Sequence, residues 1–276
     1  MNCINPLLIN NNGKDLYVPC GKCLNCRIQK RTEWTVRLLF ELTTWDVSCF
    51  ATLTYDDRYL PENGSIVKSD LVKYFKRLRR DLNGDEKLKY FGVGEYGEES
   101  GRPHYHAIVF GINDKRIEDN WTYGFVHKGY VSHDSIQYVC KYIFKKFTGK
   151  MEDKEYKSKG KENVFRIMSK GIGRDAFESY IDSGWKKEYL TVNGLRRAYP
   201  KYFWDRLDEA MKDNIKSLAE QREMELQGFL KSALYRNDPD KWEFITRKDH
   251  SKNKQIEKTM QKKIDLNNKL KKKSGV

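Results

Sequence analysis

The sequence of 276 residues lacks any run of about 18 or more apolar residues, so it predicts no membrane-spanning helix. Residues 1–20 also lack the basic start and the long apolar core of a secretory signal peptide. Without an export signal, we expect the six cysteines to lie in a reducing compartment. Clustered cysteines there bind metals or carry out redox chemistry rather than form disulfides.

Acidic residues are in the minority. The 53 lysines and arginines against 39 aspartates and glutamates give a formal net charge of +14. Such a surplus favours an anionic partner, either nucleic acid or an anionic membrane surface. Aromatic residues make up 13% of the chain, with 17 tyrosines, which is more than a charged linker protein carries.

Composition and patterning divide the chain into four parts. Residues 1–30 are loop-like and rich in cysteine, and residues 31–150 alternate between strand and helix patterns. Residues 151–246 begin with a charged segment that we expect to be mobile and continue as a helical accessory region. Residues 247–276 hold 11 basic residues against 3 acidic ones and predict a disordered tail.

The second part predicts one domain. Its expected elements are a helix over 31–45, a strand over 48–55, a helix capped by Ser69 and running to about Leu82, strands over 88–97 and 104–111, a short helix, a strand over 125–132 and a helix over 135–147. This order predicts an α+β fold, an antiparallel-sheet split β-α-β arrangement of the ferredoxin or RRM type.

Histidine is scarce, with five in the chain, yet two stand two residues apart in "GRPHYHAIVFG", residues 101–111. Side chains alternate along a strand, so His104 and His106 project to the same face. If the two flanking strands form a hairpin, Glu95 lies opposite His104 or within one pairing step, with Cβ atoms about 5 Å apart. Two imidazoles and a carboxylate predict a three-ligand site for a divalent metal.

A plainer interpretation stays open, in which both histidines are polar residues on a half-exposed strand. A slip of one residue in the hairpin register would also turn Glu95 to the opposite face of the sheet. Glu98 and Glu99, in the loop, are weaker candidates for the third ligand.

Downstream, "QYVCKYIFKK" places Tyr138 and Tyr142 four residues apart, on one face of the expected helix. Lys141 and Lys145 fall within about 60° of Tyr138 on that face. The alternative is that both tyrosines only pack. Combined with the metal site, the pair predicts phosphoryl transfer by a tyrosine nucleophile, because a metal and nearby lysines offset the cost of about 4 kcal/mol of forming phenolate at pH 7. Attack would link DNA to tyrosine and free a 3′-hydroxyl.

Three stretches together resemble the motifs of one family in order and spacing. They are "FATLTY" (50–55), "GRPHYHAIVFG" (101–111) and "YVCKY" (138–142). They resemble the motifs of His-hydrophobic-His rolling-circle replication initiators of the two-tyrosine type. The flanks are similar to the gokushovirus branch of the Microviridae: "VPCGKCLNCR" (18–27), "GEYGE" (94–98), "SKGIGR" (169–174) and "RRAYPKYFWDRL" (196–207).

The resemblance covers roughly residues 1–207 and implies a function. His104 and His106 are expected to bind Mg²⁺ or Mn²⁺ with Glu95 as third ligand, a position that varies between branches. Tyr138 and Tyr142 are expected to nick the viral-sense strand at a double-stranded origin and later rejoin it. The implied partners are origin DNA, single-stranded viral DNA and the host helicase and polymerase, with no membrane, in the host bacterial cytoplasm.

Two further sets of residues are candidates for binding. Cys20, Cys23 and Cys26 follow a C-x-x-C-x-x-C pattern, and Cys3 supplies a fourth thiol for a structural Zn²⁺ site. An iron–sulfur cluster and unligated cysteines are the alternatives. A basic set is expected to contact DNA phosphates without reading bases: Lys73, Lys76, Arg77, Arg79, Arg80 and Arg102.

Other functions share part of these features. A plasmid or mobilisation relaxase uses the same chemistry, but relaxases usually carry the tyrosine before the histidine motif. A non-catalytic, zinc-stabilised DNA-binding protein would need neither tyrosine. A metallohydrolase with His-x-His is a third possibility, although the chain lacks the repeated β/α pattern of a barrel.

Overall fold

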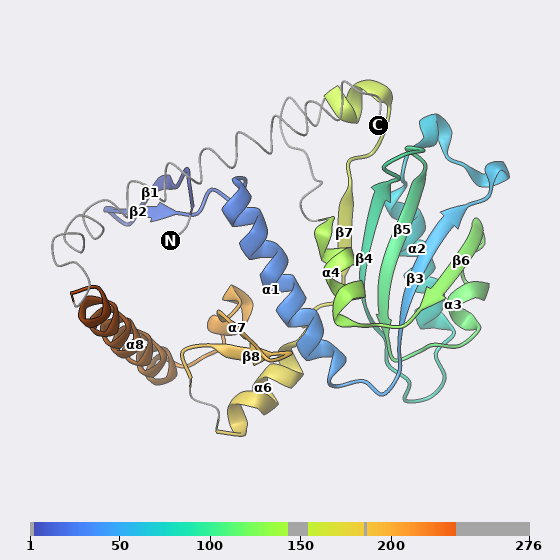
Figure 1. Cartoon of the computed structure of the whole chain (residues 1–276). Helices are drawn as coiled ribbons and strands as arrows, with labels where there is room; N and C mark the ends of the chain where they lie inside the picture. Colours follow the sequence, from blue (N-terminus) through green and yellow to red (C-terminus); the bar gives the residue numbers. More distant parts are fainter. Residues whose placement is uncertain (1–2, 143–153, 185–186, 236–276) are drawn as a thin grey trace. The chain divides into compact units, whose positions relative to one another are not determined.

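The computed structural model describes residues 3–142, 154–184 and 187–235 (Figure 1). The chain forms two compact units: residues 30–184 make one, and the first 29 residues together with the chain from Trp185 onward make the other. Among the described residues, no helix combines the length and the apolar character that crossing a membrane requires. The expected tail over 247–276 lies outside the described residues.

A five-stranded antiparallel sheet forms the centre of the first unit, with the strand order β6-β3-β5-β4-β7 (Figure 1). The strands are β3 (Ser48–Tyr55), β4 (Lys89–Tyr96), β5 (Pro103–Phe110), β6 (Gly124–Gly129) and β7 (Phe165–Met168). The order of the first four strands is that of a split β-α-β fold. The predicted α+β class with an antiparallel sheet is confirmed.

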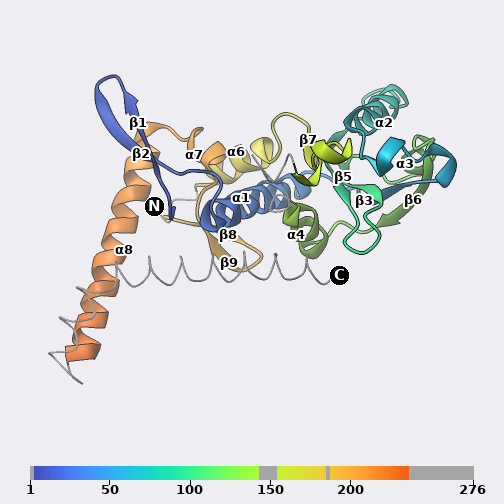
Figure 2. The same cartoon turned by 90° about the horizontal axis from the view of Figure 1, so that it is seen from above.

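One face of the sheet is covered by α2 (Lys68–Arg80) and the short α3 (Arg116–Asp119) (Figures 1 and 2). Strand β3 alternates strictly between buried and half-buried positions, and its buried residues join the apolar side of α2 in one core. That core includes Leu53, Tyr105, Leu71, Phe75 and Leu78. The apolar side of α2 is therefore as predicted.

The opposite face carries α4 (His133–Lys141) and the part of α1 (Leu24–Leu42) that belongs to this unit. The Trp34 ring of α1 lies 5.1 Å from the Phe91 ring of β4, measured between centroids. On the same face, Phe50 of β3 lies 6.3 Å from Tyr138 of α4. Because side chains alternate along β5, this face also holds His104 and His106.

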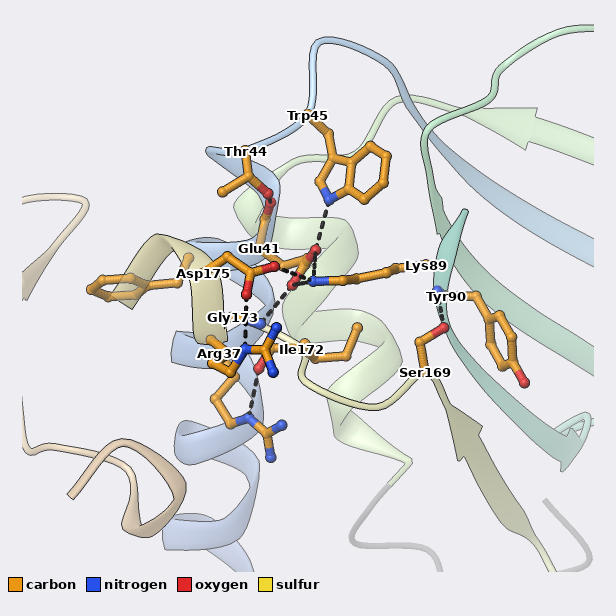
Figure 3. Close-up of polar contacts among 12 residues, drawn as sticks. Arg37, Glu41, Thr44, Trp45, Lys89, Tyr90, Ser169, Ile172, Gly173 and Asp175 are labelled. Carbon is orange, nitrogen blue, oxygen red and sulfur yellow. Dashed lines mark hydrogen bonds and ion pairs between the residues drawn. The ribbon is translucent and has the colours of Figure 1, made fainter. Parts of the chain in front are cut away.

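A buried carboxylate ties three segments of this unit together (Figure 3). Glu41 of α1 is 1% exposed and accepts hydrogen bonds from Trp45 Nε1 (2.7 Å), Lys89 Nζ (3.1 Å) and the Gly173 N–H (2.6 Å). Lys89 also pairs with Asp175 at 3.1 Å. Burial alone lowers the pKa of Lys89, and its hydrogen bonds to these two carboxylates outweigh that effect and raise it.

The second unit contains two short hairpins and two helices. Strands β1 (Leu7–Asn11) and β2 (Lys14–Val18) pair across a turn at Asn12 and Gly13, both of which have positive φ. Strands β8 (Leu190–Val192) and β9 (Leu195–Arg197) pair in the same way across a second Asn-Gly turn. Helices α7 (Lys201–Trp204) and α8 (Glu209–Tyr235) follow.

Four expectations about elements were wrong. Residues 1–30 are not loop-like, because Asn-Gly is the preferred type I′ hairpin turn and α1 begins at Leu24. Val67, not Ser69, is the N-cap of α2. The charged segment after residue 150 contains a 3₁₀ turn (Lys157–Lys159) and the edge strand β7, and the later region holds the β8–β9 hairpin besides α6 (Arg174–Asp182) and the other helices. Two further 3₁₀ turns, Asp57–Tyr59 and Glu62–Gly64, precede α2.

Candidate metal and tyrosine site

The β4–β5 hairpin sets the register of the candidate metal ligands. Glu95 and His104 are direct partners across the two strands, so a one-residue slip is excluded. The connecting loop closes with a hydrogen bond from the Gly97 N–H to the Arg102 carbonyl (3.0 Å). Gly101 adopts a positive φ of 62°, which glycine tolerates readily.

The three predicted ligands converge on one point. Glu95 Oε1 lies 2.8 Å from His104 Nε2 and 3.1 Å from His106 Nε2. One ligand atom from each residue lies within 4.8 Å of the others, an arrangement that can hold a metal ion. Glu95 and His106 are buried, whereas His104 is half-buried at the mouth. A buried carboxylate of this kind is expected to be paired with a cation or with hydrogen-bond donors.

The outer nitrogen of each imidazole has its own partner. His104 Nδ1 lies 3.1 Å from the Arg102 carbonyl oxygen, and His106 Nδ1 lies 3.0 Å from Thr52 Oγ1. A carbonyl only accepts, so His104 Nδ1 carries a proton. In the neutral imidazole, Nε2 then presents a lone pair to a carboxylate oxygen at 2.8 Å. Two acceptors at that distance need a proton or a cation between them, so the donor set fits a divalent metal ion.

Both tyrosines lie against this cluster. The ring of His106 is 5.1 Å from that of Tyr138 and 5.4 Å from that of Tyr142, and the two phenol rings are 5.2 Å apart. Tyr138 is 43% exposed, whereas Tyr142 is 6% exposed. Burial raises the pKa of Tyr142, and its hydrogen bonds to Tyr138 and Glu95 raise it further.

Helix α4 presents the two phenols from one turn. Its start is fixed by a capping box, in which the Ser132 side chain accepts from the Ser135 N–H and the Ser135 side chain accepts from the Ser132 N–H. The helix therefore begins at His133, two residues before the predicted start, and Tyr142 is its C-cap. The predicted continuation to residue 147 lies outside the described residues.

The two candidate lysines differ in what can be said of them. Lys141 is exposed at the end of α4, and its Nζ lies 3.8 Å from Glu98 Oε1. This contact places a loop carboxylate near the lysine rather than at the metal ligands. Lys145 lies outside the described residues.

The basic set of α2 lies on the opposite face of the sheet from His104. Lys73, Lys76 and Arg80 are exposed there. Arg77 instead donates from Nε to the Asn120 carbonyl (2.9 Å), and the Arg79 guanidinium lies over the Tyr90 ring at 4.9 Å. The structure therefore does not bring this set to the metal and tyrosine site.

Arg102 lies beside the site but has internal partners. Its guanidinium donates to the Tyr55 carbonyl at 2.7 Å and pairs with Asp57 Oδ1 at 2.6 Å. These contacts fix the loop whose carbonyl accepts from His104. Arg102 thus orients a metal ligand in this structure.

Two neighbours of His106 were not predicted from the sequence. Thr52 pairs with His106 across β3 and β5 and contacts its Nδ1, and Phe50 stacks on its ring at 5.7 Å between centroids. Both belong to the "FATLTY" stretch. Their spacing of two along a strand is the signal that places them on one face.

The predicted cysteine cluster forms in the second unit. Cys3, Cys20, Cys23 and Cys26 bring their sulfurs within 4.8 Å of one another. Cys49 and Cys140 are fully buried elsewhere, in β3 and α4. Burial raises the pKa of the Cys49 thiol to about 11, as expected for a packing residue.

Known proteins similar to the chain come from small phages and viruses. Residues 48–147 match the "Replication-associated protein" family of the ORF2 type. The chain is 30% identical over 231 residues to "Replication-associated protein ORF2" of Spiroplasma virus 4, across 72% of this chain and 70% of that protein. The chain belongs to this family of replication-associated proteins.

Two further members of the family have similar identity. "Replication-associated protein VP4" of Bdellovibrio phage phiMH2K is 29% identical over 258 residues, which cover 79% of this chain and 80% of that protein. "Replication-associated protein ORF4" of Chlamydia phage 1 is 29% identical over 222 residues, 71% of this chain. The match spans little more than half, 55%, of the Chlamydia phage protein's length. No solved structure matches the chain.

Proposed function

We propose that this replication-associated protein is a metal-dependent, site-specific single-strand DNA endonuclease and ligase of the His-hydrophobic-His, two-tyrosine type. It nicks one strand at a double-stranded origin, forms a 5′-phosphotyrosine link and leaves a free 3′-hydroxyl for rolling-circle synthesis. It then rejoins the displaced strand. One observation carries the proposal: both phenol rings lie within 5.4 Å of an imidazole that faces a candidate cation position.

In the first step, the Tyr138 oxygen attacks the scissile phosphorus. The new bond joins the tyrosine oxygen to phosphorus, the bond from phosphorus to the 3′-oxygen breaks, and that oxygen takes up a proton while the phenol proton leaves to solvent. The phosphodiester is exchanged for a phosphotyrosine ester, so a later 3′-hydroxyl can reverse the step. Tyr142, one turn away, is the second nucleophile.

Glu95, His104 and His106 would hold the cation. When bound, Mg²⁺ or Mn²⁺ supplies charge stabilisation and orientation for the phosphate oxygens. The imidazole nitrogens favour Mn²⁺ on ligand softness, and cellular abundance favours Mg²⁺. Thr52 and the Arg102 carbonyl hold the imidazole rings in the orientation that leaves both Nε2 atoms for the cation.

The proposed partners follow from the same chemistry. Origin DNA and single-stranded viral DNA are the substrates, and the net charge of +14 favours binding to both. The free 3′-hydroxyl requires a polymerase and strand displacement requires a helicase, for which we propose those of the host. The proposed site of action is the host bacterial cytoplasm.

Nicking of supercoiled plasmid that carries the origin tests this proposal. With Mn²⁺ present, the expected product after protease treatment is a relaxed circle with peptide fixed to a 5′ end. The double variant Tyr138→Phe, Tyr142→Phe is expected to lose this product. The matched control is Tyr130→Phe, because Tyr130 is 91% exposed and lies outside the site. Nicking that survives in the double variant, or in the presence of a chelator, would contradict the proposal.

A further inference from the structure

Four thiols in the second unit lie at the spacing of a tetrahedral metal site. Cys3 Sγ is 3.9 Å from Cys23 Sγ, and Cys20 Sγ is 4.0 Å from Cys26 Sγ. Zinc–sulfur bonds of about 2.3 Å in a tetrahedron place neighbouring sulfurs about 3.8 Å apart. A disulfide needs sulfurs at about 2 Å. All four cysteines are free thiols, so their spacing matches a shared ion and not a pair of disulfides.

Backbone N–H groups support the charged form of these sulfurs. The N–H groups of Lys22 and Cys23 donate to Cys20 Sγ at 3.4 and 3.3 Å, and the Cys20 N–H donates to Cys3 Sγ at 3.2 Å. The turn that directs them requires a positive φ of 69° at Gly21. Hydrogen bonds donated to sulfur favour thiolate over thiol, and thiolate is the form that binds metal.

Apolar packing does not account for this cluster. The four cysteines pack around a single buried isoleucine, Ile4. Burying one such side chain contributes roughly 2 kcal/mol, which is little to order a segment of this length. The β1–β2 hairpin beside it is exposed at every position except Val18, which is half-buried. An isolated hairpin is marginally stable at best, so another interaction has to hold it.

We propose that Cys3, Cys20, Cys23 and Cys26 bind one structural Zn²⁺, which fixes the β1–β2 hairpin to the start of α1. Four sulfurs within 4.8 Å leave room for a single ion and not for a multi-iron cluster. Four thiolates suit Zn²⁺, and the energy of binding adds directly to folding energy. This site is separate from the proposed nicking reaction, and it binds a different class of metal from the His and Glu site.

The test measures zinc in the full chain with the other site removed. A His104→Ala, His106→Ala chain, purified without chelator, is expected to hold about one zinc per chain by mass spectrometry of the metal. Adding Cys23→Ser and Cys26→Ser is expected to lower this to about a tenth or less, because two remaining thiolates bind zinc weakly. Adding Cys49→Ala and Cys140→Ala instead removes two buried cysteines elsewhere and is expected to leave the zinc in place.

A second measurement keeps the proposal testable if the cysteine variant folds poorly. Titrating the His-substituted chain with a thiol-blocking mercurial, in the presence of a zinc-indicating dye, is expected to release zinc in step with thiol modification. Absence of zinc from that chain, retention of zinc in the Cys23→Ser, Cys26→Ser chain, or iron with visible absorption in place of zinc would each overturn the proposal. No DNA is present, so a failure of the nicking proposal leaves this result unaffected.

Discussion

His104 and His106 each use one ring nitrogen for the candidate cation and the other for a neighbour. The neighbour of His104 is a backbone carbonyl, and that of His106 is the hydroxyl of Thr52. Partners of this kind fix ring orientation and tautomer, and losing one typically costs 10- to 100-fold in metal affinity or activity, in round figures about 1 to 3 kcal/mol. Thr52 is therefore the residue outside the ligand set whose loss tells most about the site.

Thr52→Val is expected to weaken Mn²⁺ binding by about tenfold, because the hydroxyl that orients His106 is replaced by a methyl group of similar size. Free Mn²⁺ measured by electron paramagnetic resonance during a titration gives the affinity. The matched control is Thr54→Val, since Thr54 lies on the same face of β3 and its hydroxyl donates to the Phe125 carbonyl instead. Equal affinities for both variants would show that Thr52 does not orient the ligand.

Gly111 closes the "GRPHYHAIVFG" stretch under a steric constraint. It adopts a φ of 101°, and a Cβ built there would lie 2.1 Å from the Lys87 carbonyl oxygen. Gly111→Ala is expected to lower the free energy of unfolding by about 2 kcal/mol or more, measured by urea denaturation. Gly101→Ala is the control, because its φ is also positive but nothing lies within 4 Å of the added carbon. Similar losses for the two variants would rule out the clash as the cause.

At the scale of elements, Glu41 links the end of α1 to β4 and to the segment before α6 (Figure 3). Its carboxylate is buried, and each of its contacts comes from a different part of the chain. Removing one partner of a buried charge pair leaves the other charge unpaired, which costs about 3 to 5 kcal/mol. This single side chain thus fixes the position of the "SKGIGR" stretch in its own unit.

Glu41→Ala is expected to destabilise the chain by about 3 kcal/mol or more in urea denaturation, because Lys89 and the Gly173 N–H lose their acceptor. Asp175→Ala is the control: it also contacts Lys89, but its side chain is half exposed, so the expected loss is below about 1 kcal/mol. A loss at Asp175 that equals or exceeds the loss at Glu41 would contradict this ranking.

Local patterns predicted most of the elements and the hairpin register. Alternation in "SCFATLTY" and the loop between the glycines at 97 and 101 were sufficient to place Glu95 opposite His104. Strand β7 was missed because four residues containing Arg166 carry no clear alternation. A signal was present in β4, since a Cβ on Gly94 would lie 2.8 Å from the Phe165 ring of β7.

The face on which α2 packs could not be predicted, because it depends on strand order. A helix pattern shows which side of α2 is apolar, not which side of the sheet it covers. With β5 between β3 and β4, the handedness rule for crossovers between parallel strands places α2 and α3 on one face. Helix α4 follows the last strand of that pattern and is free to pack on the other face, where it carries Tyr138.

For the whole molecule, the main consequence is that charge and chemistry lie on different faces of the sheet. Lys73, Lys76 and Arg80 are exposed on α2, on the face away from His104. Their predicted contact with phosphates therefore concerns DNA that wraps beyond the cleavage site. Such contacts add affinity that depends on salt and carry no base specificity.

Replacing Lys73, Lys76 and Arg80 together by glutamine tests this separation. If all three contact phosphates, the slope of log affinity against log salt for a long origin duplex is expected to decrease by about 2 to 3, since each contact contributes roughly 0.9. Fluorescence anisotropy at several salt concentrations gives the slope. Cleavage of a short single-stranded oligonucleotide is expected to be unchanged, because that substrate occupies only the face with Tyr138. Slower oligonucleotide cleavage with an unchanged duplex slope would place the basic residues of α2 at the cleavage site instead, against the position that the sheet gives them.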